Sequence, residues 1–353
     1  MPEFKITPPK DKVENAILPY LTIPLIKICT QKCVYCGDGA EMTLSEQRQF
    51  RTDDILDWHR VARELGVSKF RITGGEPMIH TEFRKIVETI ASDAEFVLVN
   101  TNGTLAEKFI GRWWDTPRNV HYVVNYHGAT EETYDAVSAT TGYFHVARRA
   151  IELLNKTGRL HRLNAVYNRL NAHEIWQIVD YCRELGVNLK IQDVVSVPWA
   201  FNKWHEVHVD SSSFEAELEE RASAVRDHAY ASSFGTPTKI YTVDGVEITL
   251  KSVRNGAQYD LEGVCKGCPF FPCHEGVYDV FAFADNSLWA CNWTKLARIA
   301  TGDRREKLKY MIDVFQRAQY VPVNRDLETM GSVETAPRPD QKLELQRMDA
   351  AEA

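Results

Sequence analysis

The stretch from Cys29 to Cys36 holds three cysteines spaced C-x3-C-x2-C, with Tyr35 directly before the last of them. A structural zinc ion needs four protein ligands, and after Cys36 no Cys or His follows until His59. Three thiolates on a four-iron cluster leave one iron without a protein ligand, where a small molecule can bind. The stretch therefore predicts a reactive iron–sulfur centre, with a zinc knuckle that borrows a distant ligand as the alternative.

A second group of cysteines lies in the last third of the chain: Cys265, Cys268, Cys273 and Cys291. Four thiolates suit a closed tetrahedral zinc site and a fully ligated four-iron cluster equally well. Spacing alone therefore leaves zinc and iron–sulfur open at this second site. Cys182 stands apart from both groups, in an amphipathic segment, and is predicted to be a buried core thiol.

Composition narrows the class of protein. The 353 residues are 44% hydrophobic and 26% charged, with a net charge of -7, which is ordinary for a globular enzyme and lacks the basic character of nucleic-acid-binding proteins. The N-terminal residues lack the apolar core of a signal peptide, and no apolar run is long enough to span a bilayer. We therefore expect a cytoplasmic protein with no nucleic-acid or membrane partner, whose clustered cysteines bind metal and do not form disulfides.

The elements that must position these residues alternate between strand-like and helical segments through the first two thirds of the chain. Strands are predicted over 21–28, 69–73, 95–100, 120–126, 162–167 and 188–195. Helices are predicted over 53–65, 81–92, 105–114, 131–138, 146–157 and 172–185. Since a complete eight-stranded barrel takes roughly 250 residues, these six units predict an α/β fold built as a partial (β/α)6 parallel barrel. Active sites of such folds lie at the carboxyl ends of the strands, which is where Cys29 stands.

Four regions are predicted along the chain: an N-terminal arm over 1–20, a core domain over 21–210, a small C-terminal domain over 211–332 and a disordered tail over 333–353. The C-terminal domain is expected to begin with one long polar helix over 211–232. Two hairpins should follow, over 241–250 and 278–291, turning at Asp244-Gly245 and Asp285-Asn286.

The first cysteine group resembles the signature of the radical S-adenosylmethionine (SAM) enzymes, which is this C-x3-C-x2-C pattern with an aromatic residue before the last cysteine. Residues 69–77, which read KFRITGGEP, resemble the second motif of that family. The resemblance implies that Tyr35 packs near the adenine and that the second motif holds the methionine end of SAM. The glycines would let the backbone approach SAM, and the glutamate would accept from its α-ammonium group. The motif residues concerned are Gly74, Gly75, Glu76 and Pro77.

Two further strand ends resemble the same family. Residues 100–103 read NTNG, like the family's TNG strand end, and residues 125–133 read NYHGATEET, like a strand-to-helix step of the branch that includes the molybdenum-cofactor GTP cyclase. The resemblance implies that Thr101, Asn102 and Asn125 contact SAM. His127 stands where that branch has aspartate, so we expect that it could touch the substrate, with a packed loop histidine as the alternative. Weaker matches extend the resemblance to about residue 195.

The resemblance implies two cofactors, SAM and a [4Fe-4S] cluster held by Cys29, Cys33 and Cys36. An electron from the reduced cluster would cleave SAM to methionine and a 5′-deoxyadenosyl radical, which abstracts hydrogen from the substrate. A donor such as flavodoxin or ferredoxin would supply that electron. Many radical SAM enzymes carry a second, auxiliary [4Fe-4S] cluster in a C-terminal domain, so the resemblance favours iron at the second cysteine group. Either all four of its cysteines ligate that cluster or one is a bystander.

Lys69, Arg71 and Arg162 stand where the GTP cyclase branch has basic residues near its substrate, so they join His127 as candidate substrate contacts. Three departures from the GTP cyclase branch argue against GTP as the substrate. Thr22 stands where that branch has an arginine, seven residues before the first cysteine, and residues 278–284 lack the arginines that the branch has there. The C-terminal Gly-Gly of the branch is also absent. We therefore expect a smaller, less charged substrate, with decarboxylation of a uronic-acid nucleoside such as cytosylglucuronic acid, in antibiotic biosynthesis, as the best candidate. The alternatives are a GTP 3′,8-cyclase-like enzyme, a peptide-modifying enzyme and a non-catalytic protein with two metal sites.

Overall fold

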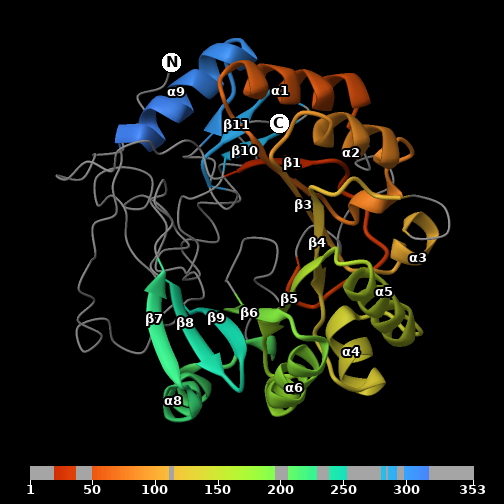
Figure 1. Ribbon diagram of the computed structural model, residues 1–353, viewed down its shortest axis with the longest axis vertical. Helices are drawn as coiled ribbons and strands as arrows, with labels where there is room; N and C mark the ends of the chain where they lie inside the picture. The colour runs from red at the N-terminus through yellow and green to blue at the C-terminus, as the bar shows by residue number, and fades with distance from the viewer. Residues whose placement is uncertain are drawn as a thin grey trace.

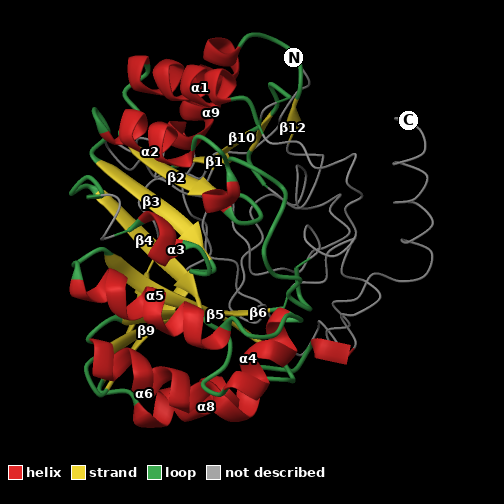
Figure 2. Ribbon diagram, turned by 90° about the vertical axis from the view of Figure 1, so that its right-hand side faces the viewer, coloured by secondary structure: helices red, strands yellow, loops and turns green. Residues whose placement is uncertain are grey.

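The computed structural model describes residues 20–36, 50–110, 115–194, 206–228, 238–252, 280–283, 285–291 and 298–317. Within these residues one sheet of twelve strands runs in the order β12-β11-β10-β1-β2-β3-β4-β5-β6-β9-β8-β7. The sheet curves like an open barrel, with the helices on its outer side (Figure 1). Viewed from the side, α1, α2, α5 and α6 cover that outer side one after another (Figure 2).

The first six strands are all parallel to their neighbours in the sheet. They are β1 (Leu21–Pro24), β2 (Lys69–Thr73), β3 (Phe96–Thr101), β4 (Val120–Asn125), β5 (Leu160–Tyr167) and β6 (Asn188–Asp193). The helices between them are α1 (Thr52–Glu64), α2 (Phe83–Ala91), α3 (Ala106–Phe109), α4 (Glu131–Ser138), α5 (Phe144–Lys156) and α6 (Ile175–Leu185), with the short helices η1 (Pro77–Ile79) and η2 (Ala172–Glu174). The predicted partial (β/α)6 barrel is confirmed.

The two faces of the sheet differ because side chains alternate along each strand. Residues that face the helices, such as Ile72, Val99 and Ala165, are fully buried in the main hydrophobic core. The opposite face, which we call the inner face, is largely polar. In register across it lie Asn125, Asn164, Lys190 and Thr249, one from each of four neighbouring strands. A polar inner face suits a barrel that binds a ligand inside.

The described strands of the C-terminal region extend the same sheet at both edges. At one edge β9 (Val246–Lys251) pairs parallel with β6, followed by β8 (Thr238–Val243) and β7 (Ala224–His228). At the other edge β10 (Val280–Ala282) pairs parallel with β1, followed by β11 (Leu288–Trp289) and β12 (Arg298–Ile299). Both hairpins turn where predicted, with positive φ angles at Asp244 (48°), Gly245 (82°) and Asn286 (68°). The domain boundaries stay a prediction.

The single long helix predicted over 211–232 is wrong. Helix α8 spans Ser212–Arg221, and strand β7 begins at Ala224. The backbone turns extended at Ala222 (φ -70°, ψ 129°), and β7 then pairs with β8 along its whole length. Strand pairing therefore overrides a helical preference that is local and weak. Among the described residues, no helix is long and apolar enough to cross a membrane.

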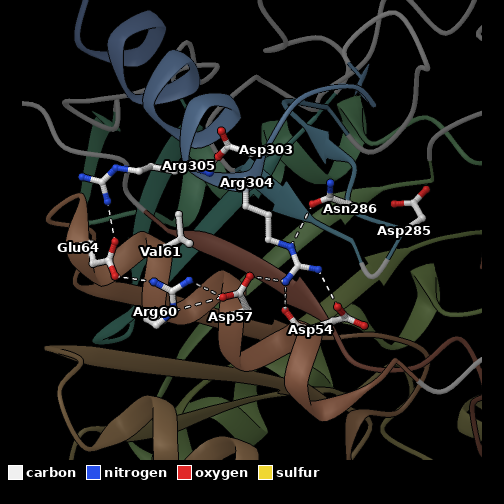
Figure 3. A pocket seen from close by; sticks show the side chains of 10 residues that line it. All are labelled: Asp54, Asp57, Arg60, Val61, Glu64, Asp285, Asn286, Asp303, Arg304 and Arg305. Atoms are coloured by element: carbon white, nitrogen blue, oxygen red, sulfur yellow. Dashed lines mark hydrogen bonds and ion pairs between the residues drawn. The ribbon is translucent and has the colours of Figure 1, made fainter.

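Helix α9 (Arg304–Arg317) contacts α1 through ion pairs, and this connects the C-terminal part of the described chain to the first helix. The Arg304 guanidinium donates to Asp54 Oδ1 at 2.8 Å and to Asp57 Oδ2 at 2.7 Å, and its side chain is 15% exposed (Figure 3). A cavity of about 670 Å³ opens between these elements. The arginines that line the cavity pair with carboxylates that line it, as for Arg305 with Glu64 at 2.6 Å, so the cavity is a structural junction between α1 and α9.

Candidate active site

The loop that carries the three cysteines continues β1 alongside the loop after β2. Gly75 N–H donates to Ile26 O at 2.7 Å, and Glu76 N–H donates to Ile28 O at 2.8 Å. The predicted SAM motif and the first cysteine, Cys29, are therefore held next to each other by backbone hydrogen bonds. This contact builds the site where two parallel strands end, as the fold class requires.

Gly74 and Gly75 are needed for that contact. A Cβ atom on Gly74 would lie 2.4 Å from Ile26 O, and one on Gly75 would lie 2.2 Å from Ile28 O. Both distances are shorter than any real Cβ contact, and Gly74 has a φ of 150°, which L side chains rarely adopt. The two glycines thus allow the loop after β2 to lie directly against the segment that leads to Cys29. Their approach to SAM stays a prediction.

Glu76 is completely buried at the centre of the site. Its carboxylate accepts from Met78 N–H at 3.1 Å, from Thr101 Oγ1–H at 2.9 Å and from Asn102 N–H at 2.8 Å. Burial raises the pKa of Glu76 to about 7, although these donors oppose the effect. Thr101 Oγ1 lies 2.9 Å from the second carboxylate oxygen as well, but its hydroxyl has a single proton to donate. Three donated protons on about four lone-pair positions leave one position for another donor. Pro77, the last residue of the predicted motif, is buried and begins η1.

Asn102 joins this group to the cysteine loop. Its Nδ2 donates to Thr30 Oγ1 at 2.9 Å and lies 3.4 Å from Cys29 Sγ, while the Gln31 backbone nitrogen lies 3.5 Å from the same sulfur. N–H groups aimed at a sulfur stabilise its thiolate form. Three predicted SAM contacts, Glu76, Thr101 and Asn102, therefore belong to one hydrogen-bonded group that reaches the first predicted cluster ligand.

The three thiols of the loop fit a cluster in their chemistry. Cys29 and Cys33 are partly buried and Cys36 is exposed. The charge of Cys36 helps to raise the pKa of both other thiols, and that of Cys29 helps to raise the pKa of Cys33. Burial is the main cause that raises the pKa of Cys29 to about 11 and of Cys33 to about 12, and iron would remove those protons by coordination. Among the described residues no three metal-binding side chains converge on one ion. A cluster is larger and takes one thiolate per iron.

His127 lies inside the protein. It is 1% exposed, its Nδ1 lies 3.1 Å from Val166 N, and its Nε2 lies 2.5 Å from Tyr35 Oη. Burial lowers its pKa to about 3, so the ring is neutral. Both ring nitrogens are engaged within the protein, which favours the packed histidine, and the substrate contact stays a prediction.

The three candidate substrate cations lie at different places. Lys69, at the amino end of β2, forms an ion pair with Glu95 at 3.4 Å. The Arg71 guanidinium lies 4.6 Å from the centroid of the Tyr20 ring. Arg162 Nε donates to its neighbour Asn164 at 3.1 Å. All three belong to the inner face, and Lys69 lies at the end of β2 away from the glycines.

Several polar side chains of the inner face are absent from the sequence-based candidates, among them Asn100, Lys190, Gln192 and Lys251. Asn164 pairs with Lys190 in register, and two residues later Gln192 pairs with Lys251, which is 4% exposed. The alternation of polar and apolar residues in NLKIQD, residues 188–193, was the available signal. Asn125, a predicted SAM contact, is the last residue of β4 on this same face.

The second cysteine group is described in part. Cys265, Cys268 and Cys273 lie outside the described residues, so their metal stays a prediction. Cys291 follows β11 and packs at the edge of the main core. Because β11 runs antiparallel to β10, and Val280 pairs with Leu21, Cys291 lies toward the amino end of β1. Cys29 lies beyond the other end of that strand.

Comparison with known proteins agrees with this geometry. Residues 23–191 match the model of the Radical SAM superfamily. A probable GTP 3′,8-cyclase from Methanothermobacter thermautotrophicus (strain Delta H) is 30% identical over 244 residues, which cover 68% of this chain and 76% of that protein. A second, from Methanothermobacter marburgensis, is 31% identical over 210 residues, covering 58% of this chain and 67% of that protein.

Among solved structures, Streptococcus suis SuiB bound to S-adenosylmethionine superimposes with a TM-score of 0.54 at 14% identity. The match covers 84% of this chain and 66% of SuiB, so the chain spans just under two thirds of that protein. SuiB bound to its precursor peptide SuiA gives the same TM-score at 13% identity, over 85% of this chain and 65% of SuiB. At this identity the likeness bears on the fold alone.

Proposed function

Because this chain belongs to the radical SAM superfamily, whose members use SAM and a [4Fe-4S] cluster, we propose that it abstracts hydrogen from a nucleoside-like small molecule. One observation carries the proposal: Glu76, Asn102 and Cys29 form a continuous hydrogen-bonded group at the carboxyl ends of adjacent parallel strands. That group places the predicted SAM motif against the predicted cluster ligands. When bound, the cluster and SAM supply the electron and the radical.

The side chains of the site take distinct roles in this proposal. Cys29, Cys33 and Cys36 hold the cluster. Glu76 offers its remaining lone pair to the α-ammonium of SAM, while Thr101 and Asn102 fix the direction of its carboxylate. The polar inner face binds the substrate next to SAM, away from bulk water.

We expect a substrate that resembles the one of the GTP 3′,8-cyclases, because the two similar proteins described above are named probable GTP 3′,8-cyclases. Arg71, Arg162 and Lys190 on the inner face suit an anionic group, and the asparagines of that face suit the polar atoms of a sugar or base. We therefore place a cyclase-like reaction on a nucleotide ahead of decarboxylation of cytosylglucuronic acid.

One observation favours the decarboxylation as the second candidate. Thr22, where the cyclase branch has arginine, is 1% exposed, and its Oγ1 has no hydrogen-bond partner among the described residues. A neutral side chain at this place on the inner face supports a substrate with fewer negative charges than GTP. Peptide modification has no comparable support from the described residues.

The proposal is tested with anaerobically reconstituted protein that is reduced by dithionite or by flavodoxin or ferredoxin. We expect about four irons per chain if only the first cysteine group binds a cluster, and about eight if Cys265, Cys268, Cys273 and Cys291 hold an auxiliary cluster. Reduction should yield 5′-deoxyadenosine from SAM. GTP and cytosylglucuronic acid are then supplied separately, and transfer of substrate deuterium into 5′-deoxyadenosine identifies the one that reacts.

Two cysteine variants separate the enzyme from a protein with structural metal. Cys33→Ala should abolish SAM cleavage, whereas Cys182→Ala, which removes a buried thiol of α6, should retain it. Zinc in place of iron, or SAM cleavage that survives in Cys33→Ala, would show that the proposal is wrong.

A further inference from the structure

A closed ring of hydrogen bonds fixes the side chain of Asn102 beside the first predicted cluster ligand. The Thr104 backbone N–H, which can only donate, lies 3.0 Å from Asn102 Oδ1. This contact identifies that atom as the amide oxygen, so the nitrogen Nδ2 faces the cysteine loop. Nδ2 donates to Thr30 Oγ1 at 2.9 Å and lies 3.4 Å from Cys29 Sγ. A backbone donor therefore sets the orientation of the amide.

The protons of this ring can be assigned one after another. Thr104 Oγ1 lies 2.7 Å from Asn102 Oδ1, which can only accept, so the Thr104 hydroxyl proton is used there. Thr104 Oγ1 must then accept from Thr30 Oγ1–H, which lies 2.7 Å away. Thr30 Oγ1 in turn accepts one Nδ2 proton of Asn102. The second Nδ2 proton is left for the Cys29 sulfur.

The Asn102 side chain is fully engaged and has little freedom to turn. It offers two protons and two oxygen lone pairs, and the ring and the sulfur use all four. The residue is 5% exposed, and its backbone N–H is bound separately to Glu76 Oε2 at 2.8 Å. The Gln31 backbone nitrogen is a second donor, 3.5 Å from Cys29 Sγ. Of these two donors to the sulfur, the Asn102 amide belongs to a side chain and can be removed by substitution.

We propose that the Asn102 side-chain amide donates a hydrogen bond to the Cys29 thiolate of the SAM-binding cluster, and that this donor raises the reduction potential of the cluster. This inference rests on the proposed function, since it needs a cluster at Cys29. Hydrogen bonds to the sulfurs of an iron–sulfur cluster help to set its potential. A donor stabilises the reduced state more than the oxidised state, because the reduced cluster is more negative. The side chain of Asn102 thus acts on the cluster, while its backbone N–H orients the Glu76 carboxylate.

The experiment is a redox titration of the anaerobically reconstituted protein followed by electron paramagnetic resonance, with and without SAM. The signal that changes on addition of SAM belongs to the SAM-binding cluster, which separates it from any auxiliary cluster. Asn102→Ser removes the amide but keeps the backbone N–H that binds Glu76. The midpoint potential of this cluster should therefore shift to a more negative value, whereas the Kd for SAM should stay as it is.

Asn119→Ser is the matched control. The Asn119 amide donates to Ala91 O at 2.9 Å and to Ala94 O at 2.8 Å. Asn119 directly precedes β4, so it lies at the amino ends of the strands, whereas Cys29 lies beyond the carboxyl end of β1. Removal of this amide should leave the potential of the SAM-binding cluster unchanged.

A spectroscopic measurement tests the hydrogen bond itself. Wild-type protein labelled with ¹⁵N at the side-chain amides of its asparagines is reconstituted, reduced and studied by pulsed electron paramagnetic resonance. A donor nitrogen 3.4 Å from Cys29 Sγ should give a ¹⁵N hyperfine coupling on the signal of the SAM-binding cluster. The coupling should be lost in labelled Asn102→Ser and kept in labelled Asn119→Ser.

Each result decides the inference. An unchanged potential in Asn102→Ser, with or without a higher Kd for SAM, overturns it, and so does an equal shift in Asn119→Ser. SAM cleavage by the wild type would in either case leave the proposed function intact. If Asn102→Ser fails to assemble the cluster, the labelled wild type decides: a ¹⁵N coupling supports the inference, and its absence overturns it. A wild-type protein without an iron–sulfur cluster overturns both the inference and the proposed function.

Discussion

The buried carboxylate of Glu76 accepts the backbone N–H of Asn102 at 2.8 Å. This hydrogen bond joins the loop after β2 to the loop after β3, and the Asn102 side chain continues the connection to Cys29 Sγ at 3.4 Å. Burial of a carboxylate is costly, and it raises the pKa of Glu76 to about 7 even with three donors in place. A cationic group of SAM would relieve that cost, which is why the position suits an ammonium ligand.

Replacement of this carboxylate should therefore weaken SAM binding. Glu76→Gln removes the negative charge and turns one acceptor into an amide N–H that faces the Asn102 and Thr101 donors. Loss of a hydrogen bond to a charged group costs about 1.5–3 kcal/mol, so the Kd for SAM should rise roughly 10- to 100-fold. Equilibrium dialysis with labelled SAM measures it. Glu82→Gln, an exposed change at the start of α2, should leave the Kd as it is, and equal affinity in both variants would count against the assigned role.

Gly75 offers a second test, on assembly of the site. Gly75→Ala would put a Cβ 2.2 Å from Ile28 O, so the segment that leads to Cys29 must move. We expect reconstituted Gly75→Ala to bind little iron at the first site. Gly66→Ala is the matched control, because Gly66 has a φ of 86° with no atom within 4 Å of an added Cβ. It should lose about 1–2 kcal/mol of stability to backbone strain and bind iron normally. Iron content and urea unfolding distinguish the two, and full iron in Gly75→Ala would refute the steric argument.

The sequence could bring together residues that stand at strand ends. Glu76 follows β2, Thr101 ends β3 and Asn102 follows it, and the carboxyl ends of parallel strands must meet at one edge of a sheet. Their contact with SAM stays a prediction. The βα alternation and the Asp244-Gly245 turn are also local patterns, so they could be read without knowledge of tertiary contacts.

Positions decided by tertiary contacts could not be predicted in this way. His127 meets Tyr35 across 92 residues of sequence, and its direction is set by the Val166 backbone. The strand β7 exists because β8 lies beside it, although its residues read as a continuation of α8. The register that brings Lys190 level with Asn125 likewise depends on two strand pairings at once.

Arg304 allows the junction between α9 and α1 to be tested. Its removal leaves Asp54 and Asp57 without their shared, largely buried partner, so Arg304→Ala should lower the free energy of unfolding by about 1–3 kcal/mol. Urea unfolding measures this, and limited proteolysis should cut first near α9. Arg60→Ala removes another partner of Asp57 whose side chain is 60% exposed, and it should have a much smaller effect. Equal losses in the two variants would show that the junction adds nothing beyond a surface ion pair.

The buried imidazole of His127 predicts how stability depends on pH. Its pKa is lowered to about 3 by burial, from 6.5 in the unfolded chain, so between these values the unfolded state binds a proton that the folded state does not. The free energy of unfolding is therefore highest above pH 6.5 and falls as the pH drops, by about 1.4 kcal/mol per unit for this group alone. By pH 5 the loss is roughly 2 kcal/mol.

His127→Asn lacks the titrating ring but keeps every other ionisable group, including His161, whose pKa is lowered to about 4 by burial and by nearby Arg162. The difference in unfolding free energy between the two proteins therefore isolates His127. Urea unfolding of the iron-free protein at pH 7, 6 and 5 should show the wild type losing roughly 2 kcal/mol more than the variant by pH 5. Parallel pH profiles would mean that the ring is protonated in the folded state, which is incompatible with an Nδ1 that accepts from Val166.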